Sequence, residues 1–245
     1  MEQKNLNKIS FEKFKYFSAP IEKISVESFR KECYENGADV TFTEMIRLKG
    51  LVRNNKTTWK RLEIKETTIV VPTIVQLVIS NEKDLTKFLE IFKPFKGFKG
   101  FNINVGCPSS SLIKIGLGCA AMKRVTKIQN YIDIIKKYDY GVSVKLRLGM
   151  NKYERNKKIY LNLIKTTTPD FFVVHARDGT QNYSNPADFK VYKECVETGK
   201  VIVANGDIQN AKQINYLKSR GVKGAMIGRE AVKNKKIFNE LKKNL

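Results

Sequence analysis

The chain has 245 residues, of which 42% are hydrophobic, a length and core content that fit one α/β barrel and exclude wholesale disorder. It carries 46 Lys and Arg residues against 24 Asp and Glu, a formal net charge of +22. This excess favours polyanionic partners, nucleic acid in particular, over the simpler interpretation of a solvated lysine-rich surface. The four cysteines are scattered and form no CxxC pair, so the sequence offers no zinc or redox motif.

The N-terminal segment predicts neither a signal peptide nor a membrane anchor. Residues 1–5 are polar, and no apolar run approaches the ~20 residues that a membrane helix needs. Scattered cysteines in a chain of this size are typical of a reducing compartment. We therefore expect a cytoplasmic protein without membrane contact, in which a polar lead-in over residues 1–15 precedes a single domain over residues 16–245.

Short apolar or β-branched segments alternate with helical segments along the rest of the chain. This alternation is typical of βα units with a parallel sheet, and eight units favour closure into a (β/α)8 TIM barrel. No Gly-x-Gly-x-x-Gly follows the first strand, which argues against a Rossmann domain. The expected strands are 16–18, 40–43, 69–78, 101–105, 142–146, 171–174, 201–204 and 225–227, and the expected helices are 27–36, 82–92, 128–138, 155–165, 187–197, 210–219 and 233 onward, with a basic loop or helix over 47–65.

Polar residues stand at the ends of most of these strands. Active sites of such barrels lie at the carboxyl ends of the strands, so the fold would gather these residues into one mouth although they are far apart in the sequence. The residues concerned are Gln76, Asn104, Cys107, Lys145, Arg147, His175, Arg177, Asn205, Asp207 and Arg229.

Cys107 follows a strand that ends abruptly. Phe101, Ile103 and Val105 alternate as in a half-buried strand, and Gly106 then releases the backbone. Taken alone, the thiol is better explained as a small buried hydrophobe. The other polar strand ends favour a functional thiol instead. Because a cysteine thiol is mainly protonated at neutral pH, it can act as a general acid without an activating base.

The loops after the last two strands predict a phosphate site. Asn205-Gly206-Asp207-Ile208 and Ile227-Gly228-Arg229 occupy the positions where such barrels bind phosphate, with glycine allowing close backbone approach and an extra helix N-terminus nearby. Arg229 adds a cationic contact. The alternative is ordinary loop glycines beside a surface arginine. His175 is the only histidine, and we expect it to serve this phosphate site rather than a metal, for which the chain offers too few ligands.

Lys145 lies within the apolar strand 142–146. Burying an unpaired charge is costly, so its amine must face the mouth or meet an anion. A cofactor that becomes anionic on reduction would suit this position. The alternative is a lysine whose amine reaches solvent along its aliphatic stem.

Several blocks of residues, in a fixed order and spacing, resemble the signatures of the tRNA-dihydrouridine synthases. The resemblance covers roughly residues 16–238, and a chance match of all the blocks is very improbable. The blocks are Ala19-Pro20, Thr43-Glu44-Met45, Asn102-Ile103-Asn104-Val105-Gly106-Cys107-Pro108-Ser109, Gly116-Leu117-Gly118-Cys119-Ala120-Ala121, Val144-Lys145-Leu146-Arg147-Leu148-Gly149, His175-Ala176-Arg177, Asn205-Gly206-Asp207-Ile208 and Met226-Ile227-Gly228-Arg229.

The resemblance implies an FMN-containing barrel that reduces specific uridines in tRNA to 5,6-dihydrouridine, with NADPH or NADH as the reductant. Hydride would pass from the reduced flavin to C6, and Cys107 would protonate C5. By the same resemblance Ala19, Pro20 and Ile21 line the flavin ring, Gln76 and Lys145 hold its polar edge, His175, Asn205, Gly206, Asp207, Gly228 and Arg229 surround the ribityl phosphate, and Asn104 and Arg177 contact the substrate.

The chain also departs from the family pattern. The family usually carries Met and Gly after Ala-Pro, whereas this chain has Ile21-Glu22-Lys23. It ends soon after Phe238, where many members continue, so we expect a short form lacking most or all of the C-terminal helical domain. We expect a monomer that grips tRNA through the basic residues Lys49, Arg53, Lys56, Lys60 and Arg61.

Two other functions stay open on the sequence. A related FMN barrel would act on a free pyrimidine, but a small substrate gives no reason for a net charge of +22. A basic RNA-binding protein on a decayed barrel would not need Cys107, Lys145 and His175 to be intact.

Overall fold

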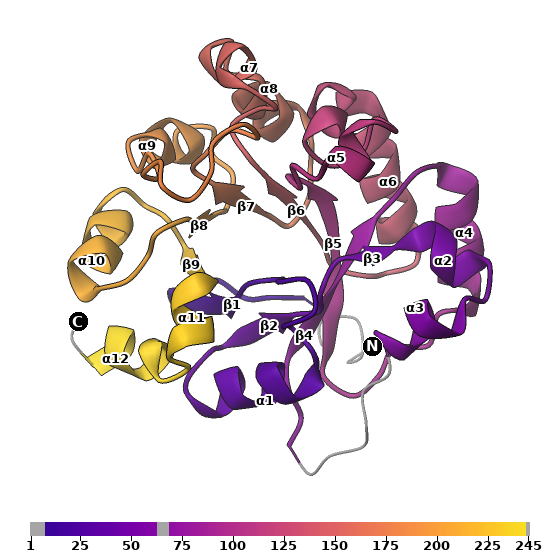
Figure 1. Cartoon of the computed structure of the whole chain (residues 1–245), viewed down its shortest axis with the longest axis horizontal. Helices are drawn as coiled ribbons and strands as arrows, with labels where there is room; N and C mark the ends of the chain where they lie inside the picture. Colours follow the sequence, from indigo (N-terminus) through magenta and orange to yellow (C-terminus); the bar gives the residue numbers. More distant parts are fainter. Residues whose placement is uncertain (1–7, 63–68, 244–245) are drawn as a thin grey trace.

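The structure is a computed structural model and describes residues 8–62 and 69–243. Figure 1 looks along a ring of strands that is surrounded by helices. The nine strands form one all-parallel sheet in the order β2-β1-β9-β8-β7-β6-β5-β4-β3, and a further pairing between β2 and β4 closes it. The predicted (β/α)8 barrel is therefore confirmed. The strands are β1 (Lys15–Ser18), β2 (Val40–Phe42), β3 (Ile46–Arg47), β4 (Thr73–Val78), β5 (Phe98–Val105), β6 (Val142–Leu146), β7 (Phe171–His175), β8 (Ile202–Asn205) and β9 (Gly224–Ile227).

Nine strands form an eight-stranded barrel because β2 and β3 share one place in the wall. Thr41 of β2 pairs with Thr73 at the start of β4, and Ile46 of β3 pairs with Leu77 near its end. Residues 43–45, between these two strands, are not part of either strand. The predicted second strand is thus confirmed as β2, whereas the short strand β3 that follows it was not predicted from the sequence.

Most predicted helices exist, and several have different bounds. Asn81 caps α4 as its sequence suggests, accepting a hydrogen bond of 2.8 Å from the Asp84 N–H. The helix predicted over 155–165 is divided at Lys158, whose φ of +51° breaks the helical path. The helices are α1 (Glu27–Glu35), α2 (Leu48–Val52), α3 (Lys56–Lys60), α4 (Glu82–Ile91), α5 (Ser110–Ile113), the 3-10 helix η2 (Gly118–Lys123), α6 (Val125–Lys137), α7 (Lys152–Asn156), α8 (Ile159–Thr166), α9 (Val191–Val196), α10 (Ala211–Ser219), α11 (Arg229–Lys233) and α12 (Ile237–Lys243).

Other element boundaries also differ from the sequence-based prediction. β4 begins only at Thr73, because Pro72 lacks the N–H that a strand ladder requires. The last predicted helix, from residue 233 onward, corresponds to α12, which begins only at Ile237, and the short helix α11 before it was not predicted. The basic segment predicted over 47–65 forms β3, α2 and α3, and its residues 63–65 lie outside the described residues.

The lead-in takes part in the core. Phe11 packs against the barrel interior, with its ring 5.1 Å from that of Phe171 and 6.2 Å from that of Phe17, measured between centroids. Phe171 begins β7, so Phe11 lies at the amino-terminal end of the barrel. The opposite end is left for the polar residues. Residues 1–7 of the lead-in lie outside the described residues, and within those described no helix is long and apolar enough to cross a membrane.

Candidate functional site

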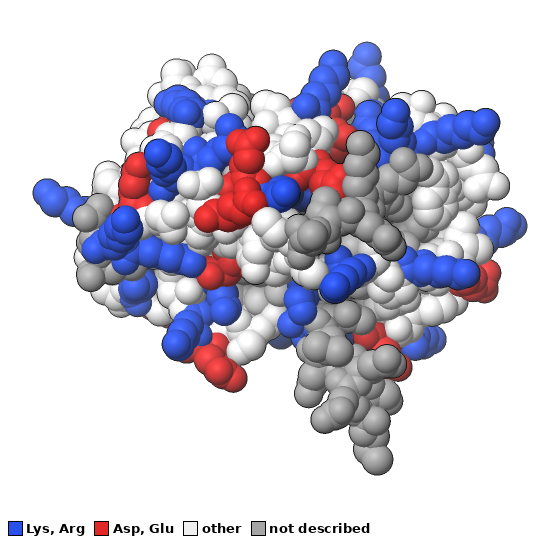
Figure 2. Space-filling model, turned by 90° about the horizontal axis from the view of Figure 1, so that it is seen from below, with Lys and Arg blue, Asp and Glu red and all other residues white. Residues whose placement is uncertain are grey.

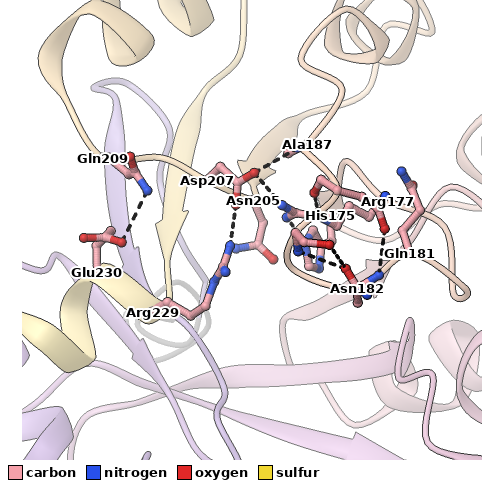
Figure 3. Close-up of polar contacts among 12 residues, drawn as sticks. His175, Arg177, Gln181, Asn182, Ala187, Asn205, Asp207, Gln209, Arg229 and Glu230 are labelled. Carbon is pink, nitrogen blue, oxygen red and sulfur yellow. Dashed lines mark hydrogen bonds and ion pairs between the residues drawn. The ribbon is translucent and has the colours of Figure 1, made fainter.

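A pocket opens at the carboxyl ends of β6 to β9 and β1 (Figure 3). Its apolar lining comes from the segment after β1 together with Met226, and most of its polar lining comes from the loops after β7, β8 and β9. The lining residues are Ala19, Pro20, Ile21, Lys145, His175, Arg177, Tyr183, Asn205, Gly206, Asp207, Ile208, Gln209, Met226, Gly228, Arg229 and Glu230.

Asp207 organises the polar side of the pocket. One carboxylate oxygen lies 2.5 Å from Arg177 and also accepts the Ala187 N–H at 2.9 Å, while the other lies 2.5 Å from Arg229 (Figure 3). Burial on its own raises the pKa of Asp207, but the hydrogen bonds and charges of Arg177, Ala187 and Arg229 outweigh it and lower the pKa below its usual range. The carboxylate is therefore ionised and holds both arginines in place.

The backbone before this carboxylate requires a glycine. Gly206 has a φ of +113°, and a Cβ there would come within 3.0 Å of Ala187 Cβ and His175 Cδ2. Asp207 itself adopts a left-handed φ of +50°, a conformation that aspartate tolerates better than most residues. Together the two residues turn the chain sharply after β8 and direct the carboxylate toward the arginines.

His175 is neutral in this site. Burial, and then the charges of Lys145, Arg147, Arg177 and Arg229, lower the pKa of His175 far below its usual range. Its Nε2 lies 3.2 Å from Arg177 Nη1, and because a guanidinium only donates, Nε2 must accept. The single proton is therefore on Nδ1, which is a donor for a ligand.

Lys145 reaches the pocket from β6. Its Nζ donates to Asn205 Oδ1 at 3.0 Å, and Asn205 is fixed in turn by donating to the Met226 carbonyl at 2.8 Å. Burial, followed by the charge of Arg147, lowers the pKa of Lys145 to about 8. No carboxylate among the described residues forms an ion pair with this amine. The amine is thus a charged group that an anionic ligand would stabilise.

Cys107 lies on the loop after β5, and its side chain is half-buried. Asn104 shapes this loop, because its Oδ1 accepts the N–H groups of Gly106 at 3.1 Å and Cys107 at 3.0 Å. The Cys107 carbonyl accepts the N–H of Cys119 at 3.0 Å. Asn104 pairs in register with Lys145 on the neighbouring strand, so the thiol loop and the lysine belong to adjacent parts of the mouth.

The pocket brings together most of the residues that the sequence predicts as a site. Gln76, Asn104 and Cys107 do not line it. Gln76 is 1% exposed and bonds to other amides, and Arg177 has no exposed side-chain surface and is engaged by protein acceptors. Contact of Gln76 with a flavin and of Arg177 with a substrate therefore stay predictions, and the structure gives Arg177 a second role in holding Asp207.

Sequence reasoning missed three polar residues of the pocket. Arg229 stacks on the ring of Tyr183, with its guanidinium carbon 4.0 Å from the ring centroid. Glu230 accepts from Gln209 at 3.3 Å (Figure 3). Tyr183 lies on a long loop with no periodicity to mark it, whereas Gln209 and Glu230 directly follow predicted blocks and were detectable from that position.

The pocket fits an anionic ligand with an apolar, planar part. Its lining carries three cationic side chains against two carboxylates, and its histidine is neutral. The same pocket is also lined by the apolar residues Ala19, Pro20 and Ile21. The donor set, which includes His175 Nδ1 and the Arg229 guanidinium, matches a phosphate. A phosphorylated aromatic cofactor such as FMN has both of these features.

The fold and the site define the chain as a (β/α)8 barrel with a cationic pocket at the carboxyl ends of its strands. The sequence model of the family described as dihydrouridine synthase (Dus) matches residues 17–245. The chain therefore belongs to the dihydrouridine synthase family.

Several relatives carry names from this family. The human protein named tRNA-dihydrouridine(47) synthase NAD(P)(+)-like is 29% identical over 231 residues, which are 93% of this chain and 35% of the human protein. The yeast tRNA-dihydrouridine(20a/20b) synthase is 25% identical over 90% of this chain and 61% of its own length. The tRNA-dihydrouridine synthase B of Pasteurella multocida is 25% identical over 92% of this chain and 68% of its own length. The chain thus spans about a third of the human relative.

The fold is also found in a solved structure with little sequence similarity. N-(5'-phosphoribosyl)anthranilate isomerase from Pyrococcus furiosus superposes with a TM-score of 0.53 at 13% identity, over 95% of this chain and 98% of the isomerase. At this identity the likeness concerns the barrel architecture alone.

Proposed function

We propose that this chain reduces uridines in tRNA to 5,6-dihydrouridine, with FMN in the pocket and NADPH or NADH as the reductant, as a monomer in the cytoplasm. The observation that carries the proposal is the pocket itself, which combines a phosphate-type donor set, an apolar surface and the Lys145 amine, which donates to the neutral side chain of Asn205. The names of the relatives supply the substrate class and the nicotinamide.

Different parts of the pocket would hold different parts of FMN. FMN, when bound, supplies hydride for C6 of the uracil and accepts it again from the nicotinamide. Lys145 would hold the polar edge of the ring with its positive charge, and contact of Gln76 with the same edge is part of this proposal. The ring would lie on Ala19, Pro20 and Ile21, and the phosphate would be held by His175, Asn205, Gly206, Asp207, Gly228 and Arg229.

Within this phosphate set, Asp207 acts through its neighbours. Its carboxylate is occupied by two arginines and one N–H, so it orients Arg229 rather than facing the phosphate itself. The direct contacts would come from the Arg229 guanidinium, from His175 Nδ1–H and from backbone groups near Gly206.

Cys107 donates the proton that completes the reaction at C5 of the uracil. Its loop follows β5, which is the neighbour of β6, the strand that carries Lys145. Asn104 uses its oxygen to hold this loop and one Nδ2 hydrogen to bond Gln76, and its second Nδ2 hydrogen is the group proposed to contact the uracil.

The tRNA would be held by exposed cations outside the pocket, since a uridine must leave its stack to reach it. Lys49, Arg53, Lys56 and Lys60, on or beside α2 and α3, are exposed and form the patch that we call the α2–α3 basic patch. Arg61 differs, because it pairs with Glu44 at 3.6 Å. Figure 2 shows Lys and Arg spread widely over one face of the molecule, so cations there are also available to RNA.

The test begins with the purified protein. We expect it to be yellow and to release FMN on heating, identified by its mass. With NADPH or NADH it should form dihydrouridine in unmodified tRNA, measured by nucleoside mass spectrometry, and leave free uridine and orotate unchanged. Reduction of the free pyrimidines would instead establish the alternative FMN barrel, and tRNA binding without any flavin would establish a binding protein.

A further inference from the structure

A row of hydrogen-bonded polar side chains crosses three neighbouring strands and ends at the Cys107 loop. We call Ser143, Asn102, Gln76 and Asn104 the polar row. Asn104 Nδ2 donates to Gln76 Oε1 at 2.9 Å, and Gln76 Nε2 donates to Asn102 Oδ1 at 2.7 Å. Asn102 Nδ2 then donates to Ser143 Oγ at 2.9 Å. Gln76, Asn102 and Ser143 are paired in register on β4, β5 and β6, and all three are at most 1% exposed.

The donor and acceptor of every hydrogen bond in the polar row follow from the groups at one end of it. The loop N–H groups of Gly106 and Cys107 can only donate, so the Asn104 atom that faces them must be its oxygen. Its amide nitrogen must then face Gln76, which turns the Gln76 oxygen toward Asn104.

The same logic continues to the other end. The Gln76 nitrogen meets the oxygen of Asn102, and the Asn102 nitrogen meets Ser143. The Ser143 hydroxyl donates a hydrogen bond to the carbonyl oxygen of Phe101 at 3.4 Å. Each amide has only one orientation that leaves no donor facing a donor, and in a buried setting the wrong orientation is costly.

We propose that Asn102 and Ser143 are positioning residues for Cys107, which they orient through Gln76 and Asn104. Neither of them lines the pocket. Their effect on catalysis rests on the function proposed above, whereas their effect on the geometry of the Cys107 loop does not. If the hydrogen bonds of the polar row are interrupted at Asn102, the amides of Gln76 and Asn104 are free to turn. The hydrogen bonds from Gly106 and Cys107 to Asn104 Oδ1 then weaken.

Two substitutions at one position separate this role from simple packing. Asn102→Leu keeps the side-chain size but removes the acceptor for Gln76. Asn102→Asp keeps that acceptor, as either a carboxylate or a carboxyl group. If Asn102 only filled space, Leu would be tolerated and Asp would not, because Asp would bury a polar group that packing does not need. If the polar row positions the Cys107 loop, Asn102→Asp should be tolerated and Asn102→Leu should not.

The primary readout is alkylation of Cys107 by iodoacetamide, followed at the Cys107 peptide by mass spectrometry. Cys107 is half-exposed, while Cys33, Cys119 and Cys195 are buried, so the signal is specific. We expect the rate to rise about tenfold in Asn102→Leu, to stay within about twofold of the wild type in Asn102→Asp, and to rise about threefold in Ser143→Ala, which deletes one oxygen and is compatible with folding.

Thr73→Val is the matched control. Thr73 is a fully buried residue of β4, like Gln76, but its hydroxyl bonds to Thr41 at 3.0 Å and does not belong to the polar row. It removes a buried hydroxyl at similar cost in stability, and the alkylation rate of Cys107 should not change.

Enzyme kinetics provide the second readout. The single-turnover rate on tRNA, measured with saturating FMN, should fall about tenfold in Asn102→Leu and recover in Asn102→Asp, with tRNA affinity unchanged. An inactive wild type would refute the proposed function, and the alkylation rates would still test whether the polar row positions Cys107. Cys107 alkylation within twofold of the wild type in both Asn102→Leu and Ser143→Ala, or a rise in Thr73→Val equal to theirs, would overturn the proposal.

Discussion

The guanidinium of Arg177 and the carboxylate of Asp207 form an ion pair at 2.5 Å in which the arginine side chain has no exposed surface and the aspartate is 23% exposed. Arg177 also donates to the Asn185 carbonyl at 2.7 Å and to His175 at 3.2 Å. The pair therefore ties the loop after β8 to the loop after β7, and those loops supply most of the polar side of the pocket. Its loss should affect both stability and ligand binding.

Asp207→Asn should lower the free energy of unfolding by about 2 kcal/mol, because it leaves the buried charge of Arg177 without its counterion while the partial exposure of Asp207 limits the cost. Urea denaturation at neutral pH measures this. Asp188→Asn is the control, since Asp188 and its partner Arg155 are both more exposed, at 30% and 28%, and its loss should cost less than about 1 kcal/mol. Equal losses in the two variants would contradict the structural role of the buried pair.

His175 should make the protein less stable in mild acid. Its pKa is strongly lowered in the folded state, so below pH 6.5, the ordinary value, the unfolded chain takes up a proton that the folded chain does not. Stability is then lost as the pH falls, by about 1 kcal/mol between pH 7 and 5.5. His175 is the only histidine, so urea denaturation of His175→Gln over the same range isolates its effect. Parallel stability curves for the two proteins would show that His175 is not held neutral.

Lys145 should make FMN binding sensitive to alkaline pH. Burial and then the Arg147 charge lower its pKa to about 8, so most of its charge is lost by pH 9. We expect FMN to bind up to about tenfold more weakly at pH 9 than at pH 7, measured by quenching of flavin fluorescence. Lys145→Met should bind weakly at both pH values, without this dependence. If the variant kept the pH profile of the wild type, another group would be responsible.

Cys107→Ala should separate cofactor binding from chemistry. Because Cys107 does not line the pocket, FMN should bind and be reduced as in the wild type. Dihydrouridine formation should slow by about 10² to 10⁴-fold, the usual contribution of a positioned general acid. Single-turnover kinetics on tRNA measure the rate. Cys33→Ala, which changes a buried thiol on α1, is the control and should remain active. Full activity of Cys107→Ala would exclude the proton-donor role.

Binding of tRNA should depend steeply on salt. Each lysine or arginine that neutralises a phosphate releases counterions, so log K falls linearly with log salt concentration, with a slope that changes by roughly one per contact. Replacing the four residues of the α2–α3 basic patch by serine should reduce this slope by roughly three to four and leave FMN affinity unchanged. Filter binding across a salt series gives the slopes. The same number of serines at Lys83, Lys87, Lys193 and Lys218, on other helices, is the control, and an equal reduction there would show that the patch has no special role.

The sequence by itself determined the barrel and most of the pocket. Strand alternation such as that of residues 142–146 and breaks such as Gly37 after α1 are local signals, and the polar blocks that follow β7, β8 and β9 are contiguous in the chain. Once eight parallel strands close, their carboxyl ends must meet, so the gathering of Lys145, His175 and Asp207 follows from the topology.

Only the tertiary structure decided how these residues are used. The sequence predicts Arg177 as a substrate contact, and the structure shows that it also pairs with Asp207, thirty residues further along the chain, which no local pattern encodes. The same holds for Gln76, whose amide faces Asn102 and Asn104 across the sheet. Periodicity specifies which face of a strand is buried, whereas the hydrogen-bond partner of a buried polar group depends on strand register, which forms only when segments distant in sequence pack together.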